Sequence, residues 1–332
     1  MKVLLINSDE GPDYLADLVN YFFLTQNIEI YTNHTLKYLF DDYPNVENLY
    51  GKGFTLYGKL DYKLKKKINQ INISSYIGGY NNFDKIIFTS ICRKFKNEPL
   101  RDNLFETINA EVKSKEIIVL DGEDGQEVNE VIANKSNYFK RELSLKYKNL
   151  AKPISFAFPK LELPKRTKSL NEKTQLLAPM DPRYVNSYIY NESDYFEQYS
   201  QSIFGTTIKK GGWDCMRHYE ILSTGTLLYF PGVEKKPFLT MNDFPTQLQI
   251  EVNHLFRKLI TSYENIDSID KIKLSNSSKN YIYKGLKKAK MQLSNMNLIE
   301  NNMRNIDDFR KEYSLWVQNW GTTDVYKKIL DL

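Results

Sequence analysis

Ser202-Ile-Phe-Gly-Thr-Thr-Ile-Lys-Lys-Gly-Gly-Trp-Asp-Cys-Met-Arg-His-Tyr-Glu-Ile-Leu-Ser-Thr-Gly225 joins a short strand to a glycine turn and the start of a helix. Residues 203–208 are mostly β-branched or aromatic, which predicts a strand. Gly211 and Gly212 follow, and glycine adopts backbone angles that other residues avoid. The pattern therefore predicts a strand that ends in a tight loop able to approach a ligand.

A helix is expected directly after this loop. Asp214 is a good N-cap, and residues 215–223 contain neither Pro nor Gly. Gly225 then ends the helix, and residues 226–231 are typical of a buried strand. Strand, helix and strand in this order form the repeating unit of an open parallel sheet. The predicted fold class is therefore α/β.

The predicted helix start is also a candidate anion site. Unpaired backbone N–H groups at a helix start attract anions, and Lys209 and Lys210 stand just before them. Arg217 and Glu220 are three residues apart, so they share one helix face. The cation would lie near a bound phosphate, and the carboxylate one turn deeper could accept hydrogen bonds from sugar hydroxyls. The pattern predicts a phosphate and ribose site.

Ordinary structural roles are the alternative for each of these residues. The two lysines could be solvated, and Arg217 with Glu220 could be a surface pair of small energetic value. Trp213 and Tyr219 are more typical of packing than of base stacking. His218 is more typical of a local hydrogen bond than of a catalytic base.

The same residues resemble a known family. Glu220-Ile-Leu-Ser-Thr-Gly225 before an apolar strand is similar to the donor-site signature of GT-B-fold glycosyltransferases, in which a carboxylate five residues before a glycine holds the nucleotide ribose. The segment from Lys209 to Glu220, with Asp121-Gly-Glu-Asp124 and Tyr138-Phe-Lys-Arg-Glu-Leu143 upstream, resembles a poorly characterised group of bacterial and phage proteins classed as glycosyltransferases. The likeness spans roughly the first three quarters of the chain.

The resemblance implies two Rossmann-like domains that face a cleft, the GT-B type, with a helical C-terminal region. It implies a nucleotide-sugar co-substrate, no cofactor and no catalytic metal. Retaining members often carry a second carboxylate eight residues before the ribose-binding one, where this chain has Gly212, so the stereochemistry stays open. The donor-binding candidates are Lys209, Lys210, Gly211, Gly212, Trp213, Arg217, His218 and Glu220, with Lys140 and Arg141 across the cleft. Pairing with Glu142 and neighbouring acids is the alternative for Lys140 and Arg141.

The length of the chain fits two domains. Its 332 residues exceed the size at which single cores usually stop growing. We expect an acceptor-side Rossmann-like domain over residues 1–150 and a donor-binding domain with C-terminal helices over residues 151–332. The Pro- and Lys-rich stretch 159–173 is the expected connection.

Apolar runs in the first half predict parallel strands alternating with helices. Pro12 suits the first turn of a helix that runs through Leu15, Leu18 and Phe22, and a second helix is expected over residues 104–112. The sequence has no Gly-x-Gly-x-x-Gly after its first strand, which argues against a dinucleotide dehydrogenase. The expected strands are residues 3–6, 28–31, 83–88 and 116–120.

The second half opens with an expected strand near residues 174–179 and becomes mainly helical after Pro231. Trp316 and Trp320 are four residues apart, which makes them candidates for packing the last helix against the first domain. The expected helices are residues 194–199, 247–260, 281–291 and 306–320.

Two acidic loops follow strands of the first half. Side chains at the carboxyl ends of parallel strands gather at one edge of a sheet. An inverting sugar transfer needs a base that removes the acceptor proton. We expect Asp13 or Asp124 to be this base, with His34 or His218 as alternatives, and Arg217 to stabilise the leaving diphosphate. A turn with helix-capping acids is the structural alternative for the second loop. The acids are Asp9, Glu10 and Asp13 in the first loop and Asp121, Glu123 and Asp124 in the second.

Composition limits the compartment and the partners. The net charge of +5 permits nucleotide binding without requiring a nucleic acid. Cys92 and Cys215 give no disulfide framework, which favours the cytoplasm. The apolar runs are too short for a signal peptide or an integral membrane segment.

The sequence leaves three functions open. The first is a glycosyltransferase that acts on a glycan or a small molecule. The second is a phage-type DNA glycosyltransferase that acts on a modified base. The third is a non-catalytic protein of the same fold that binds a nucleotide or a sugar.

Overall fold

A computed structural model describes residues 1–9, 11–49, 55–76, 78–91, 101–113, 116–262 and 302–330. Three features expected from the sequence lie outside the described residues: the acid Glu10, the thiol Cys92 and the helix over residues 281–291.

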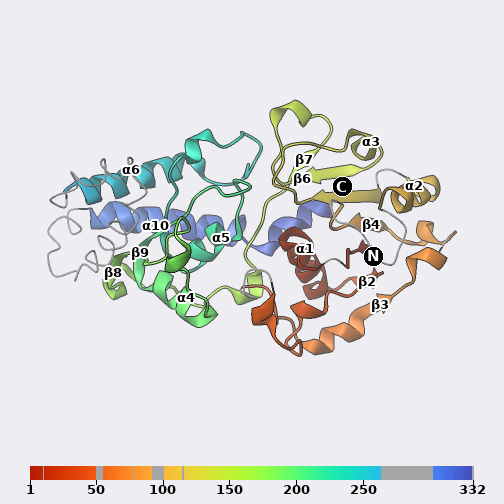
Figure 1. Ribbon diagram of the computed structural model, residues 1–332, viewed down its shortest axis with the longest axis horizontal. Helices are drawn as coiled ribbons and strands as arrows, with labels where there is room; N and C mark the ends of the chain where they lie inside the picture. Colours follow the sequence, from red (N-terminus) through yellow and green to blue (C-terminus); the bar gives the residue numbers. More distant parts are fainter. Residues whose placement is uncertain are drawn as a thin grey trace.

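The first part of the chain forms a seven-stranded sheet in which every neighbouring pair of strands is parallel (Figure 1). The strand order β3-β2-β1-β4-β5-β6-β7 is that of a doubly wound, Rossmann-like sheet. Its strands are β1 (Lys2–Ile6), β2 (Glu29–Thr32), β3 (Ile68–Gln70), β4 (Lys85–Phe88), β5 (Ile117–Asp121), β6 (Asn137–Lys140) and β7 (Lys152–Pro153).

Helices cover both faces of this sheet, which is why its central strands are almost continuous apolar runs. Val3 and Leu5 of β1 share a core with α1 (Tyr14–Thr25). Leu4 and Ile6 of the same strand point to the other face, into a core with α2 (Arg101–Glu111) and α3 (Glu130–Ala133). The core on the α1 side continues into apolar side chains of the second sheet.

The second sheet has three parallel strands in the order β10-β9-β8. It follows 3₁₀ turns at Lys160–Glu162 and Leu170–Glu172 in the expected connecting segment. Helices alternate with its strands, as the βαβ pattern predicts. The elements are β8 (Gln175–Leu177), α4 (Glu192–Ser200), β9 (Ser202–Thr206), α5 (Met216–Ser223), β10 (Leu227–Tyr229) and α6 (Thr246–Ser262).

Lys173 holds together the amino-terminal ends of the strands of the second sheet. Its side chain is 1% exposed, and its ammonium group donates to the carbonyls of Ser200 and Ser202 at 2.9 and 2.8 Å. A third hydrogen bond reaches the Thr226 hydroxyl at 3.2 Å. Burial lowers the pKa of Lys173 to about 7. The lysine therefore joins the segments that lead into all three strands.

The end of the described chain returns to the first sheet, but not through the expected tryptophan pair. Helix α10 (Met303–Asn319) packs on α5, where the Trp316 ring lies 6.0 Å from the Tyr219 ring. Trp320 is 54% exposed. The contact with α1 comes instead from the 3₁₀ segment Thr323–Ile329, whose Tyr326 ring lies 6.3 Å from Phe22 (Figure 1).

Two further expectations need correction. Pro12 lies before the helix, because Asp13 is the N-cap of α1 and accepts hydrogen bonds from Leu15 N and Ala16 N. The short strands β3, β6 and β7 were not expected, because two to four residues give little periodicity. The expected strands 3–6, 28–31, 83–88 and 116–120 and the helices 104–112, 194–199, 247–260 and 306–320 are confirmed with small shifts at their ends.

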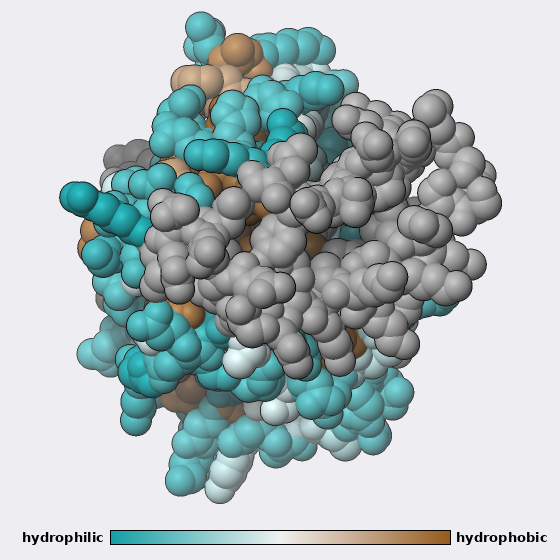
Figure 2. Space-filling view, turned by 90° about the vertical axis from the view of Figure 1, so that its left-hand side faces the viewer, coloured by the Kyte–Doolittle hydropathy of each residue, from teal (hydrophilic) through white to brown (hydrophobic). Residues whose placement is uncertain are grey.

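Outside the residues drawn in grey, the end of the molecule that carries β8 and α6 shows a mainly hydrophilic surface with smaller hydrophobic patches (Figure 2). None of the helices in the described ranges combines the length and the hydropathy that a membrane span needs.

Candidate functional site

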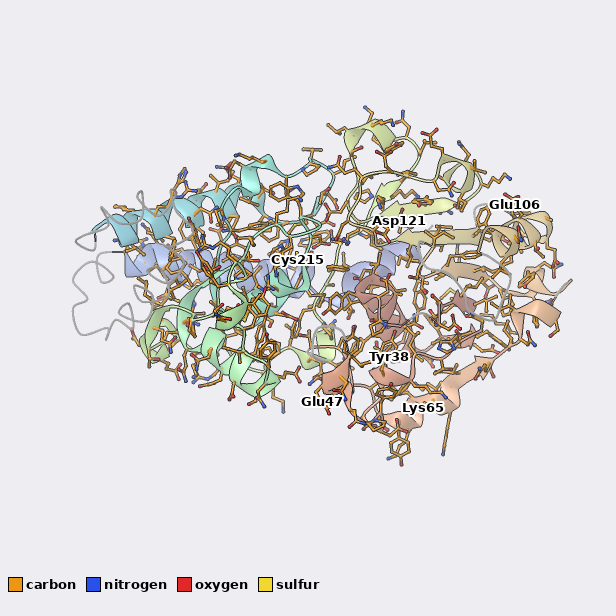
Figure 3. The ribbon with its side chains drawn as sticks, viewed as in Figure 1. Tyr38, Glu47, Lys65, Glu106, Asp121 and Cys215 are labelled. Carbon is orange, nitrogen blue, oxygen red and sulfur yellow. The ribbon has the colours of Figure 1, made fainter. Side chains whose placement is uncertain are left out.

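The loops after β5 and β6 contact the loop after β9, and we call this contact the junction. Arg141, directly after β6, donates from Nη1 to the carbonyl of Asp214 at 2.5 Å. Asp121 and Cys215 lie on the two sides of this contact (Figure 3). Because parallel strands end at these loops, the junction brings the carboxyl edges of both sheets together.

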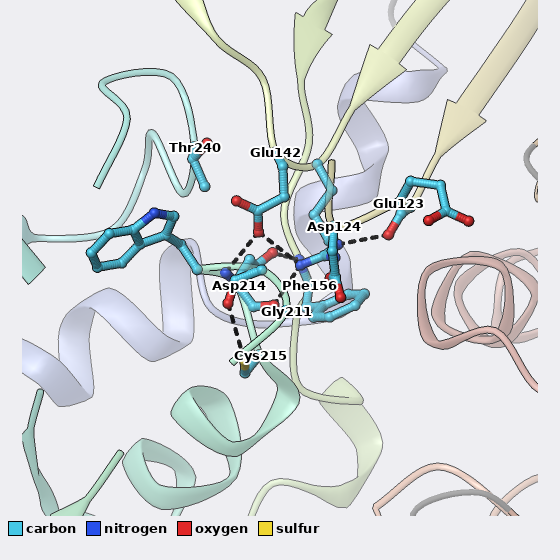
Figure 4. A network of polar contacts seen from close by, with 12 residues as sticks. Glu123, Asp124, Glu142, Phe156, Gly211, Asp214, Cys215 and Thr240 are labelled. Atoms are coloured by element: carbon cyan, nitrogen blue, oxygen red, sulfur yellow. Dashed lines mark hydrogen bonds and ion pairs between the residues drawn. The ribbon is translucent and has the colours of Figure 1, made fainter. Parts of the chain in front are cut away.

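Arg141 is the central side chain of the junction, where it contacts Glu142, Asp124 and Asp214, three of the acids labelled around the network in Figure 4. It is 2% exposed, and its guanidinium carbon lies 4.7 Å from the centre of the Phe156 ring. Nε donates to Gly122 O at 3.0 Å, Nη1 donates to Glu142 at 2.9 Å, and Nη2 pairs with Asp124. The predicted role of Arg141 toward a diphosphate stays a prediction, and here the guanidinium ties the two sheets together.

Asp214 is not the N-cap of α5. Its carboxylate accepts from Phe156 N at 2.7 Å and from the Tyr219 hydroxyl at 2.9 Å. The N-cap is Cys215, which makes no side-chain capping bond. Asp214 does not follow its local preference for a helix cap, because both carboxylate oxygens are used by these two partners, one just after β7 and one on α5.

Glu142 completes the junction with a second buried carboxylate. It is 1% exposed and accepts from Asp214 N at 2.9 Å as well as from Arg141. Burial raises the pKa of Glu142 to about 7, against the lowering effect of Arg141. Burial likewise raises the pKa of Asp214. One guanidinium thus faces three carboxylates, two of them shielded from water.

Gly211 and Gly212 are needed for close approach rather than for unusual backbone angles. Neither has a positive φ angle. A Cβ atom on Gly212 would overlap the Glu142 carboxylate and lie 2.7 Å from an Arg141 nitrogen, and one on Gly211 would overlap Asp124. The two glycines therefore let the loop after β9 touch the polar side chains of the first sheet.

We expect Gly212→Ala to lower the free energy of unfolding by about 1–3 kcal/mol, because its methyl group would meet two buried side chains with no room to move. Gly211→Ala is the matched control. The Asp124 side chain is 57% exposed and can rotate away, so this variant should stay near the parental stability. Denaturant unfolding checks the pair, and equal midpoints would contradict the packing argument.

Lys140 and Asp121 form a buried ion pair beside the junction. Lys140 Nζ lies 2.8 Å from Asp121 Oδ1 and 3.2 Å from Glu123 O. Asp121 also accepts from the Tyr138 hydroxyl at 2.6 Å and from Glu123 N at 3.0 Å. These contacts fix the start of the acidic loop. The donor-side role predicted for Lys140 stays a prediction.

The paired lysines and Trp213 lie at the rim. Lys209 and Lys210 are exposed. Lys209 Nζ donates to Gly211 O at 3.0 Å, and Lys210 Nζ contacts the Tyr188 hydroxyl and lies 5.1 Å from its ring centre. The half-buried Trp213 packs against Phe230, with 6.1 Å between ring centroids. Both ammonium groups remain accessible to solvent anions.

His218 is a buried hydrogen-bonding residue. It is 0% exposed, with its ring nitrogens 2.9 Å from the Thr207 hydroxyl and 2.8 Å from Trp213 O. Burial lowers the pKa of His218 to about 3, so the ring is neutral. The side chain shapes the loop after β9 and has no surface open to a ligand.

Arg217 differs from the other basic residues of the site. It is half-buried on the first turn of α5 and makes no hydrogen bond or ion pair within the described parts of the chain. The groups that raise the pKa of Arg217 include Tyr195, Tyr199 and Glu220. A partly desolvated cation without a fixed partner is suited to an anionic ligand.

Glu220, one turn further along α5, accepts hydrogen bonds from two hydroxyl groups. Thr55 of the first part of the chain donates at 2.7 Å, and Tyr195 of α4 donates at 2.6 Å. Glu220 is 8% exposed, and burial raises its pKa. Thr55 has a positive φ of 70°, which is uncommon for a β-branched residue. The carboxylate thus already serves as an acceptor for hydroxyls.

The two acidic loops of the first sheet lie side by side. Asp13 caps α1 and accepts from the Ser90 hydroxyl at 2.9 Å. A Cβ atom on Gly122 would lie 3.4 Å from Asp13 Oδ1, so the loops after β1 and β5 are in contact. In the described residues, no group of three or more His, Cys, Asp or Glu side chains is placed to hold a metal ion.

Sequence reasoning missed Thr55 and Tyr195 as members of the site. Thr55 and Glu220 are 165 residues apart, and no local pattern joins them. Tyr195 lies in the expected helix over residues 194–199, but nothing in the sequence marked its hydroxyl as part of a site. Glu142 was expected only as a possible structural partner of Lys140 and Arg141, and it pairs with Arg141.

Comparison with known proteins does not extend this description: no protein-family model matches the chain, and neither the curated proteins nor the solved structures contain a significant match.

Proposed function

We propose that the protein is a glycosyltransferase of the GT-B type, which transfers a sugar from a nucleotide-sugar donor to an acceptor hydroxyl. One observation carries the proposal. Helix α5 presents Arg217, a cation with no hydrogen bond or ion pair to the described residues, one turn before Glu220, and Glu220 contacts Thr55 of the first part of the chain. A cation and a hydroxyl-binding carboxylate in this order match what a diphosphate and a ribose require.

The donor is assigned to the second sheet. The hydroxyls of Thr55 and Tyr195 on Glu220 have the chemistry of ribose hydroxyls, which supports Glu220 as the ribose acceptor. Arg217 would neutralise the diphosphate, and the exposed Lys209 and Lys210 would add positive charge at its rim. A cation held near a departing diphosphate stabilises the charge that develops in the transition state.

The acceptor base is assigned to Asp13, with Asp124 second. Asp124 forms an ion pair with Arg141, so an acceptor hydroxyl would have to compete with this cation for the carboxylate. Asp13 is half-buried at the same sheet edge, where it accepts hydrogen bonds from the Ser90 hydroxyl and from the backbone N–H groups of Leu15 and Ala16. We therefore place Asp13 before Asp124 as the proton acceptor.

In the proposed reaction, Asp13 removes the proton of the acceptor hydroxyl while its oxygen attacks the anomeric carbon of the sugar. The bond between this carbon and the diphosphate oxygen breaks, and the nucleoside diphosphate leaves with both bonding electrons. Arg217 stabilises the leaving group. The step needs no metal and inverts the anomeric configuration.

Release of nucleoside diphosphate from a panel of nucleotide sugars, with and without candidate acceptors, tests the proposal. A thermal-shift screen of the same nucleotides selects the donor, because a ligand that binds only the folded state raises the melting temperature. Binding without release would support a non-catalytic protein. Transfer to duplex DNA with steep salt dependence would favour the DNA-modifying alternative.

We expect Glu220→Gln to weaken nucleotide-sugar binding by about 1.5–3 kcal/mol, because the amide loses the charge-assisted acceptor for ribose hydroxyls. Calorimetric titration measures the change. Glu192→Gln is the matched control: Glu192 accepts from Thr55 N at 2.7 Å and pairs with Lys59, so it holds the same segment without belonging to α5. Equal donor affinity in the Glu220 variant and the parent would remove the ribose role.

A further inference from the structure

A cavity of about 730 Å³ lies on the side of Thr55 that leads toward the end of α5. Its walls come from Thr55 and Lys59, from the connecting segment at 158–168, from α4, and from Ser223 and Thr224 after the Glu220 turn. This volume is in the range of small-molecule sites. Elements of both halves of the chain build it, and no residue assigned to catalysis above lines it.

The charges in this cavity are nearly all neutralised internally. Lys59 lies 2.8 Å from Glu192, and Lys168 lies 2.9 Å from Glu197. Arg166 is held by Glu172 through two hydrogen bonds. The cations are therefore not available to a phosphate or a carboxylate without the loss of an existing pair.

Glu162 is the exception among the charged lining residues. It is half-buried, and within the described residues it has no ion pair at 4 Å or less. Burial raises its pKa, and Lys59 opposes this effect from a longer distance. An anionic ligand would be repelled by this carboxylate. A ligand that brings hydrogen-bond donors would be favoured.

The rest of the lining combines hydroxyls with apolar rings. Thr55, Ser193, Ser223 and Thr224 offer groups that both donate and accept hydrogen bonds. Phe158 and Phe196, whose rings meet edge to face at 6.2 Å, supply an apolar wall. This lining suits a sugar, because a sugar ring has polar edges that match the hydroxyls and C–H faces that match the aromatic rings.

We propose that this cavity binds a neutral, hydroxyl-rich sugar, with Glu162 as the acceptor for its hydroxyls and Phe196 against its C–H face. Binding here does not depend on the proposed transfer reaction. If the transfer is confirmed, the bound sugar is part of the acceptor or is a regulatory ligand, because Ser223 and Thr224 at the end of α5 line the cavity and Arg217 does not.

Saturation-transfer NMR on the full chain tests the site with glucose, galactose, N-acetylglucosamine and maltose as probes, and with glucose 6-phosphate as the anionic counterpart. We expect at least one neutral probe to bind and glucose 6-phosphate to bind more weakly. Glu162→Gln should weaken binding of the neutral sugar about tenfold or more, which is the effect of losing a hydrogen bond to a charged group. Phe196→Ala should also weaken it.

One control tests whether the effect is local to the cavity. Glu106→Gln alters an exposed acid at the far end of the first sheet and should leave binding unchanged (Figure 3). The proposal is overturned if none of the neutral probes binds, if glucose 6-phosphate binds more tightly, or if Glu106→Gln weakens binding as much as Glu162→Gln does. These binding experiments can be interpreted even if the transfer assay shows no diphosphate release.

Discussion

Replacing Asp13 by asparagine should lower turnover by a factor of about 10²–10⁴ while nucleotide-sugar affinity stays at the parental value. Asparagine has nearly the size of aspartate and is an equally good N-cap, so α1 should keep its capping bonds to Leu15 and Ala16. The amide oxygen can still accept from Ser90. Only the ability to take a proton is lost. Steady-state diphosphate release measures turnover, calorimetry measures nucleotide-sugar affinity, and thermal unfolding measures stability.

Asp124→Asn is the matched control for this experiment. It removes one partner of Arg141 at an exposed position, so a small change in stability and little change in turnover are expected. A loss of turnover in this variant alone would transfer the role to Asp124. Parental rates in both would move the base elsewhere. His34 is then the next candidate, since it is half-buried after β2, whereas the neutral, fully buried His218 is unsuited.

The parts of the fold that were predictable have a strong local signal. β1, β4 and β5 are apolar runs buried on both faces, and α6 and α10 carry long helical patterns. β3 and β7 have no such signal: Ile68–Gln70 is mostly polar, and Lys152–Pro153 contains a proline. These strands form because a neighbouring strand offers hydrogen bonds, and β7 lies at the sheet edge, where proline is tolerated.

The site was predictable only where its residues are close in the chain. Arg217 and Glu220 share a helix face because of their spacing. The partners of the loop before this helix come from far away: Arg141 and Asp214 are 73 residues apart, and Phe156 and Asp214 are 58 apart. For example, helix-capping preferences predicted that the Asp214 carboxylate caps α5, but the folded chain does not form this cap.

The second large effect is expected for Arg217→Ala, which should lower turnover by a factor of about 10²–10³, the usual loss when one donor that stabilises a developing negative charge is removed. The change should appear in kcat more than in donor affinity, because the charge on the diphosphate is greatest as it departs. Diphosphate release at saturating donor measures it. Arg217→Lys should recover part of the rate, since the charge is kept and the planar donor geometry is lost.

Arg141→Ala is the contrasting variant for this prediction. Arg141 is buried against Glu142 and Asp124, so its removal leaves carboxylates unpaired and should lower the free energy of unfolding by about 3–5 kcal/mol. Arg217 has no such partners in the described residues, so Arg217→Ala should unfold near the parental midpoint. One arginine would then be identified with stability and the other with turnover. A parental rate for Arg217→Ala at saturating donor would show that this cation does not meet the leaving group.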